Sequence, residues 1–392
     1  MQTITDYNTL INKLEKNEEV DFIKLYKIGF TTFMRTAPTT EEVFEQLKIH
    51  VHRAHELTPL YLSLLCSAKE FDKIYEFLSK INLSGSEREY DYFNSKCIRY
   101  YYWASKETGK LKLGELYTLL ATNREFGNLC SILVLQNCLL DYFINFNSEL
   151  LSEVVSNFTM TREIEAVAEK EEAALFYFYT GYAHLVLGNY RQSLQNLDEA
   201  DILNRKKSLE LNITKCSILC KLLQGELDIK YDYDDELLPY YNLIGTVKRG
   251  EIQKLDEILH SNFDEFVSKM KLYFVARRLV ANALKEGIRK VANAYSRIRL
   301  EDVNGIFGKD VSCLVHRLIT EAEINSKVED GILIKNESSL SQNGGRRIND
   351  ALKRIIDTRE FIKKQMVYPE MPVLNYERLM EEENEMIQKF DI

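Results

Sequence analysis

Proline is missing from a long central part of this chain. Only five prolines occur in 392 residues, and none falls between Pro59 and Pro239. Apolar residues in that span recur mainly three and four positions apart, which is the spacing of one helix face. Because proline breaks helix interiors, its absence permits long helices here. The sequence therefore predicts a mainly α fold.

The clearest repeat unit is YFYTGYAHLVLGNYRQSLQNLDEADILN, residues 177–204. Gly181 lies where two helices must approach closely, the Gly188-Asn189 pair makes the turn, and Leu197 lies on the inner face of the second helix. The unit resembles one tetratricopeptide repeat and predicts a stack of helical hairpins. Its aromatic residues, which we expect to pack between hairpins, are Tyr177, Tyr179, Tyr182 and Tyr190.

Pro239 marks a junction in the pattern. Two helices that turn at Arg249-Gly250 are predicted after it, and then one long helix from about Ser268 to Ala292. The next stretch predicts a short strand at Ile298 and Leu300, a helix at 301–307, a second helix from 311 to about 323, and a hairpin around Asp330-Gly331. This order of elements is that of a winged helix.

A polar segment, NESSLSQNGG at 336–345, has the composition of a flexible linker. Beyond it, apolar residues recur in four-three steps and so lie on one face of a helix that ends before Pro369. Arg359 interrupts this stripe, and an acidic tail follows. The striped residues are Ile348, Leu352, Ile355, Ile362 and Met366.

Four parts are predicted along the chain. They are an N-terminal helical region at 1–110, TPR-like repeats at 111–238, a module at 239–336 with the winged helix at about 294–336, and a final part at 337–392. The final part holds the linker, the striped helix at 346–368 and the acidic tail.

Charge argues against a general affinity for nucleic acid. The net charge is -9, and the two helices at the DNA-facing position of the winged helix, 301–323, carry five carboxylates against Lys309 and Arg317. Repulsion from phosphate would oppose docking there. The segment 346–366 has seven positive and three negative residues, a net of +4. That charge suits RNA, an acidic partner or, as we prefer, solvent around a packed apolar stripe.

The sequence predicts no catalytic, metal or cofactor residues. The seven cysteines form no C-x-x-C pair, so a disulfide or zinc framework is not indicated. The HVHRAH cluster, residues 50–55, lacks the serine and aspartate of a metal-dependent isopeptidase. Phosphate-binding and nucleophile-elbow motifs are missing too. The most apolar run, from Leu129 to Phe143, contains polar residues, which favours a buried helix over a membrane span.

Helical hairpins leading straight into a winged helix resemble the PCI family, whose members scaffold the proteasome lid, the signalosome and an initiation-factor complex. The segments LPYYNLIGTVKRGEIQKLDEIL and RRLVANALKEGIRKVANAYSRIRLEDV are similar to the family of the lid's non-ATPase subunit 3. So are YFYTGYAHLVLGNYRQSL, LLQGELDIKY and RINDALKRIIDTREFIKKQMVYPE. The resemblance covers roughly Leu116 to Pro369. The chain is shorter than expected for that family, mainly before the repeats and in the tail.

The resemblance implies a right-handed solenoid and a non-catalytic structural subunit of the 26S proteasome lid, acting in ubiquitin-dependent protein degradation in cytoplasm and nucleus. Family winged helices associate side by side, and family C-terminal helices form a bundle. The implied winged-helix contacts are Ser296, Arg297, Ile298, Arg299, Val328, Ile332 and Ile334. The implied bundle contacts are the striped residues Ile348, Leu352, Ile355, Ile362 and Met366.

Other implied partners are further PCI subunits, a small acidic disordered lid subunit bound on the repeats and, indirectly, the proteasome base and core. Positive residues in the repeat region that suit the acidic subunit, or simply face solvent, are Arg191, Arg205, Lys206, Lys207, Lys215 and Lys221. Two alternatives stay open. One is a PCI scaffold of the signalosome or initiation complex, and the other is a nucleic-acid-binding PCI protein of messenger export. We expect neither a nucleic-acid partner nor a membrane partner.

Overall fold

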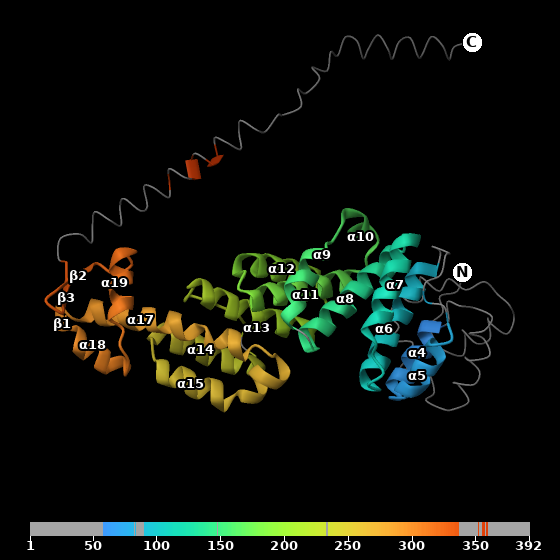
Figure 1. Cartoon of the computed structure of the whole chain (residues 1–392), viewed down its shortest axis with the longest axis horizontal. Helices are drawn as coiled ribbons and strands as arrows, with labels where there is room; N and C mark the ends of the chain where they lie inside the picture. Colours follow the sequence, from blue (N-terminus) through green and yellow to red (C-terminus); the bar gives the residue numbers. More distant parts are fainter. Residues whose placement is uncertain are drawn as a thin grey trace, which may run out of the picture. The chain divides into compact units, whose positions relative to one another are not determined.

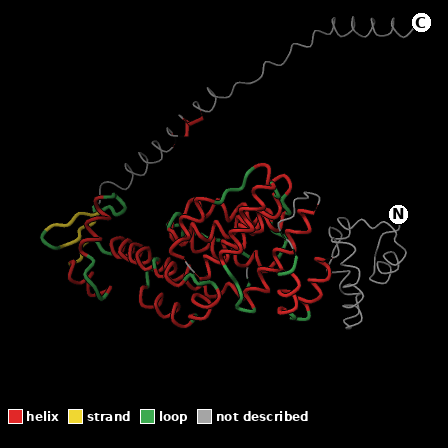
Figure 2. The backbone as a smooth tube through the Cα atoms, turned by 45° about the vertical axis from the view of Figure 1, so that its right-hand side comes forward, coloured by secondary structure: helices red, strands yellow, loops and turns green. Residues whose placement is uncertain are grey.

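The computed structural model describes residues 58–81, 83, 90–146, 148–232, 234–336, 352, 355, 356, 358 and 359. The described part is mainly helical, with strands confined to one small sheet (Figure 2), which confirms the predicted mainly α class. The chain divides into two compact units, Met1–Gly287 and Ile288–Ile392. The HVHRAH cluster lies outside the described residues.

The first unit is built from helices that follow one another in sequence order (Figure 1). Its first helices are α4 (Thr58–Ser67), α5 (Phe71–Leu78), α6 (Asp91–Glu107), α7 (Leu113–Phe126), α8 (Leu129–Phe146), η3 (Ser148–Leu150), α9 (Leu151–Asn157) and α10 (Arg162–Val167). They continue with α11 (Lys170–Leu187), α12 (Tyr190–Leu203), α13 (Lys207–Gln224), η4 (Asp235–Leu237), α14 (Leu238–Arg249) and α15 (Ile252–Ser261). The π-helix η5 (Asp264–Lys269), α16 (Tyr273–Arg277) and α17 (Leu279–Ala294) follow, and the boundary between the units falls within α17.

Each helix packs mainly on helices near it in the sequence: α6 on α8, α8 on α11, α11 on α12, and α12 on α13. Two clusters of buried apolar side chains result, one from α4 to α11 and one from α11 to α17. α11 contributes to both clusters. Burial of these faces removes apolar surface from water, which is the main source of stability.

The α11–α12 hairpin has the predicted details. A Cβ at Gly181 would lie 3.0 Å from Leu197 Cγ, so the helices approach as closely as the glycine allows. Gly188 takes a φ of 91° at the turn, a value that side chains disfavour. Leu197 and Ala200 are buried, and Tyr182 lies in the core, where its hydroxyl donates to the Met270 carbonyl at 2.7 Å.

The single long helix expected from Ser268 to Ala292 is wrong. Lys271 has a φ of 53° and separates η5 from α16. Tertiary hydrogen bonds stabilise this break in the helix. The Tyr182 hydroxyl donates to the Met270 carbonyl, and the Lys271 ammonium donates to Asn145 Oδ1 at 2.8 Å. These hydrogen bonds override the local helical pattern, which periodicity alone cannot reveal.

The turn at Arg249-Gly250 is confirmed, and it lies against α17. A Cβ at Gly250 would lie 2.4 Å from the Gly287 Cα, and Gly250 itself has a φ of 73°. Two glycines thus let the α14–α15 turn contact the α17 backbone directly. Substitution at Gly250 is disfavoured both by conformation and by space.

Helix α8 carries the most apolar run of the chain. Among the described residues it is the one helix long and apolar enough to cross a membrane, yet 61% of it is buried within the fold. Two of its polar side chains form hydrogen bonds there: Asn137 donates to Glu172, and Asp141 accepts from Tyr102 and Lys106. A buried helix accounts for both its composition and its contacts.

The second unit holds β1 (Arg297–Arg299), α18 (Leu300–Phe307), α19 (Ser312–Thr320), β2 (Ser326–Glu329) and β3 (Ile332–Lys335). The strands form an antiparallel sheet in the order β1-β3-β2. Asp330 and Gly331 turn the hairpin with φ values of 49° and 75°, as the Asp-Gly pair predicted. Two boundaries were wrong. Leu300 begins α18 rather than extending the strand, and α19 ends at Thr320, short of the expected Glu323.

Candidate functional site

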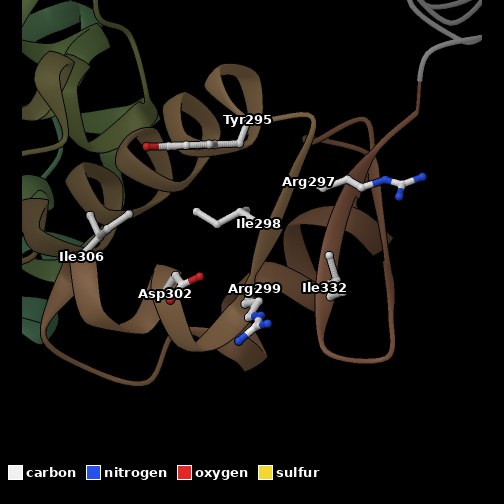
Figure 3. A pocket seen from close by; sticks show the side chains of 7 residues that line it. All are labelled: Tyr295, Arg297, Ile298, Arg299, Asp302, Ile306 and Ile332. Atoms are coloured by element: carbon white, nitrogen blue, oxygen red, sulfur yellow. The ribbon is translucent and has the colours of Figure 1, made fainter.

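A pocket of about 490 Å³ lies beside β1, between that strand and α18. Ile298 points into the space between Tyr295 and Ile306, while the Arg297 side chain points away from it (Figure 3). Tyr295 is 50% exposed and Ile306 is 53% exposed. The pocket therefore presents large apolar side chains to solvent, as protein-binding surfaces do. Its lining residues are Tyr295, Arg297, Ile298, Arg299, Asp302, Ile306 and Ile332.

The main chain of β1 has unused hydrogen-bonding groups next to this pocket. The Ser296 carbonyl accepts from the Lys335 N–H, and the Leu300 N–H donates to the Gly331 carbonyl. Because antiparallel bonding alternates along a strand, the N–H and C=O groups of Arg297 and the N–H of Arg299 point away from β3, whereas the Arg299 carbonyl is the N-cap acceptor of α18. The groups that point away from β3 form an open edge of the sheet, to which another strand can bond.

The register places the predicted contact residues on two faces of the sheet. Arg297 is opposite Ile334 and Arg299 is opposite Ile332, so these four side chains share one face. Ile298 is opposite Leu333 and so lies on the other face. Val328 is on β2, across β3 from β1, and Ser296 precedes β1. Of the predicted set, Arg297, Ile298, Arg299 and Ile332 are the members that line the pocket.

The helices of this unit carry acidic side chains. Glu301 and Asp302 lie in the first turn of α18. On α19, the Arg317 guanidinium is paired with the Glu321 carboxylate at 2.7 Å. An ion pair of this kind leaves little positive charge for phosphate. The carboxylates on these two helices oppose the docking of phosphate.

The structure describes five residues of the striped C-terminal helix, all of them helical. Leu352 is 49% exposed, Ile355 is 64% exposed and Ile356 is 52% exposed. Ile348, Ile362 and Met366 lie outside the described residues. Ile356 is an apolar neighbour of the stripe that the four-three spacing left out.

The positive residues of the repeat region differ in their surroundings. Arg191 and Arg205 are exposed, and Lys206 and Lys207 form surface ion pairs with Glu171 and Asp234. Lys221 is half-buried, with its ammonium 4.9 Å from the centre of the Tyr231 ring.

Lys215 does not belong to an exposed basic surface. Its side chain is 5% exposed, and its ammonium lies 2.7 Å from the Glu265 carboxylate, which the π-helix η5 carries. Tyr240 lies beside this pair, and burial together with the Glu265 charge raises the pKa of the Tyr240 hydroxyl. A buried ammonium needs such a partner. Sequence spacing alone gave no sign of it.

No group of three or more metal-binding side chains occurs within the described ranges. The thiols of the helical unit are poor nucleophiles, because burial raises the pKa of Cys97 and Cys138 to about 12. Burial likewise raises the pKa of Cys216. These cysteines act as small apolar core residues.

Sequence reasoning missed three residues of the pocket: Tyr295, Asp302 and Ile306. Ile306 lies between Gly305 and Phe307 on a short helix whose buried residue is Val303, and its neighbours gave no sign that it is exposed. Tyr295 follows the last residue of α17, so the helical periodicity of that segment does not predict which way its side chain points.

Comparisons with known proteins give a consistent group of relatives. The chain is 32% identical over 384 residues to the 26S proteasome regulatory subunit RPN3 of Encephalitozoon cuniculi (strain GB-M1), and the match covers 96% of this chain and 97% of that protein. No protein-family model matches the chain.

Two other relatives match in part. The RPN3 subunit of Saccharomyces cerevisiae (strain ATCC 204508 / S288c) is 24% identical over 76% of this chain and 62% of its own length. The 26S proteasome non-ATPase regulatory subunit 3 of Dictyostelium discoideum is 25% identical over 43% of this chain and 34% of its own length. This chain therefore matches less than two thirds of either protein.

Proposed function

The chain belongs to the family of 26S proteasome regulatory subunit 3, also called RPN3, and we propose that it is a non-catalytic structural subunit of the proteasome lid. It would act in ubiquitin-dependent protein degradation by holding other subunits in place. The observation that carries this proposal is the similarity to a proteasome regulatory subunit along nearly the whole length of both chains.

We assign the second unit to a winged helix and the helical unit to a right-handed solenoid of hairpins, together a PCI architecture. The element order β1, α18, α19, β2, β3 supports the first assignment. Packing of each helix on its sequence neighbours supports the second. The proposed domains keep their boundaries at 1–110, 111–238, 239–336 and 337–392.

The proposed lateral contact uses the open edge of β1. A neighbouring subunit's strand would bond to the main chain of Arg297 and Arg299, and an apolar side chain would enter the pocket beside Ile298. The exposed apolar lining supports this arrangement. The remaining proposed contacts of this surface are Ser296, Val328, Ile332 and Ile334.

The proposed bundle contact uses the striped C-terminal helix. Leu352 and Ile355 are helical and exposed, and apolar side chains in that state gain stability when other helices cover them. For the small acidic subunit we retain Arg191, Arg205, Lys206, Lys207 and Lys221 as contacts. Lys215 is left out because its ammonium is buried against Glu265.

The proposed partners are other PCI subunits of the lid, with the proteasome base and core bound indirectly. The proposed location is cytoplasm and nucleus, where proteasome particles act. The relatives named above are all proteasome subunits, so a signalosome, initiation-factor or messenger-export role has no observation that favours it.

Purification of the tagged chain from its own cells tests this function. We expect lid subunits, identified by mass spectrometry, and peptidase activity to co-purify with it. Recovery of signalosome or initiation-factor subunits in their place would reject the lid assignment. Purification of the chain without partners would reject the structural role altogether.

A further inference from the structure

A second pocket lies within the helical unit, between α7 and the segment that holds η3 and α9. Its volume is about 390 Å³. The α7 wall includes Tyr117, Leu120 and Arg124, and the facing wall includes Leu150, Glu153 and Val154. Members of each wall are three, four and seven residues apart, so each wall is one face of a helical segment.

The groove exists because the layer of helices over α8 is incomplete. α7, which packs on α8, has 14 residues, whereas the segment after α8 is divided into α9 with 7 residues and α10 with 6. Both α7 and α9 pack on α8. Between them Phe143 of α8 lines the groove and is itself buried. The groove therefore has the form of a position for one more helix.

The rim of the groove carries apolar surface and two charges. Tyr117 is 40% exposed and Leu150 is 43% exposed. Arg124 on one wall and Glu153 on the other are exposed, and neither forms an ion pair with a residue in the part of the chain that the structure describes. A partner that covers the groove would meet a positive charge on one side and a negative charge on the other.

We propose that this groove binds an amphipathic helix of another protein. Its apolar side chains, spaced by three and four residues, would lie over Phe143 between Tyr117 and Leu150. A carboxylate on one flank would face Arg124, and a cationic side chain on the other flank would face Glu153. Helices bind grooves through anchors with this spacing, and complementary charges fix the orientation. This surface is separate from β1 and from the striped helix, so the inference goes beyond the function proposed above.

The test begins with cross-linking in the full-length chain. A photoreactive p-benzoylphenylalanine replaces Ala121, an exposed residue of the α7 wall, and the protein is irradiated in an extract of its own cells. Mass spectrometry then identifies the attached peptide. We expect one peptide from a different protein, with apolar residues at helical spacing and an acidic and a basic residue on opposite flanks.

The second step measures binding of a synthetic copy of that peptide by fluorescence anisotropy. Arg124→Glu should weaken binding about tenfold, because facing like charges repel, and a peptide whose carboxylate is changed to arginine should regain that affinity. Arg277→Glu is the matched control, since Arg277 is also exposed in the last turn of a helix. The Arg277→Glu variant should bind the peptide with the same affinity as the wild type.

Four results would overturn the proposal. They are absence of any attached peptide, attachment only to residues of the same polypeptide, attachment to a second copy of this chain, and equal peptide binding by the wild type and Arg124→Glu. Co-purification with proteasome subunits is a separate measurement, so a negative result for groove binding would not affect the lid assignment.

Discussion

At the scale of single residues, one ion pair is buried where three helices of the first unit meet. The Arg99 guanidinium of α6 pairs with the Glu172 carboxylate of α11, and their side chains are 9% and 12% exposed. Asn137 of α8 donates to the same carboxylate at 3.0 Å. Burial alone would raise the pKa of Glu172, but Arg99, Lys96 and Asn137 outweigh it and lower that pKa below its usual value. The carboxylate is therefore charged in the folded protein.

Glu172→Gln should destabilise the helical unit strongly. The variant keeps the size of the side chain but leaves Arg99 buried without a counter-charge, which costs about 3 kcal/mol. Melting followed by circular dichroism should show a Tm roughly 6–12 °C lower at pH 7. The control is Glu171→Gln, because Glu171 pairs with Lys206 at the surface and such pairs contribute at most about 1 kcal/mol. Equal Tm values for both variants would show that the buried pair adds no stability.

The stability difference between the wild type and Glu172→Gln should depend on pH. Because the folded pKa of Glu172 is lowered, the pair contributes its full stability above the unfolded pKa of about 4.3 and loses it as the pH falls through the folded pKa. The difference in Tm between wild type and Glu172→Gln should thus be constant from pH 7 down to about 5 and shrink at lower pH. A difference that grows with acidity would contradict this sign.

Sequence predicts some single residues and not others, for a physical reason. Gly181, Gly188 and the Asp330-Gly331 turn were predictable, because their roles depend on local backbone conformation and on spacing along one hairpin. Lys215 was not, because its burial depends on Glu265, which is 50 positions away in the sequence and reaches it only in the folded unit. The position of a charged residue in a helical sequence pattern does not reveal whether a distant residue will bury and neutralise it.

At the scale of elements, the contact between the α14–α15 turn and α17 depends on glycine. Gly250→Ala should cost about 1–2 kcal/mol for its left-handed conformation and about 1–3 kcal/mol more for overlap with the Gly287 backbone. The control is Gly109→Ala, whose φ is also positive at 67° but whose Cβ would meet nothing within 4 Å. Chemical denaturation should show a clearly larger loss for Gly250→Ala. Equal losses would mean that α17 moves aside without cost.

The open edge of β1 allows a selective change. Arg299 has a φ of -70°, which proline adopts without strain, and its N–H points away from β3. Arg299→Pro should therefore leave the unit folded by circular dichroism while removing one donor from the edge. We expect at least about a fivefold loss of incorporation into the lid, since strand addition depends on main-chain bonds. Arg299→Ala keeps the N–H and should incorporate normally, and a loss as large as that of proline would point to the side chain instead.

Element boundaries were predicted less well than the elements themselves. The order of strand, helices and hairpin followed from periodicity and from the Asp-Gly turn. Leu300 was placed in the strand because it alternates with Ile298, yet Arg299 is the extended N-cap residue of α18 and Leu300 is the first residue of that helix. The break at Lys271 depends on Asn145 and Tyr182, which lie in other helices. Pocket members such as Tyr295 were missed because a pocket joins elements whose packing no single segment specifies.

At the scale of the whole molecule, the proposed role depends on surfaces that this chain leaves exposed. The helical unit has two continuous buried clusters, and burial of these side chains within the chain itself contributes to its stability. By contrast, the pocket beside β1 and the described part of the striped helix expose isoleucine and leucine side chains. Exposed apolar surface of this kind gains stability on assembly. Folding and assembly should therefore respond to different substitutions.

The double variant Leu352→Asp and Ile355→Asp tests this separation. Both side chains are about half exposed or more, at 49% and 64%, so aspartate should change the free energy of unfolding of the isolated chain by less than about 1 kcal/mol per site. In the lid the same carboxylates would be buried among apolar helices, which costs several kcal/mol each unless they are paired. We expect a folded monomer that fails to co-purify with lid subunits after expression in its own cells. Thr358→Asp is the control, because it places one aspartate on the same exposed helical segment outside the stripe. Normal incorporation of the double variant would remove the striped helix from the proposed contacts, whereas failure of the control as well would attribute the loss to charge alone.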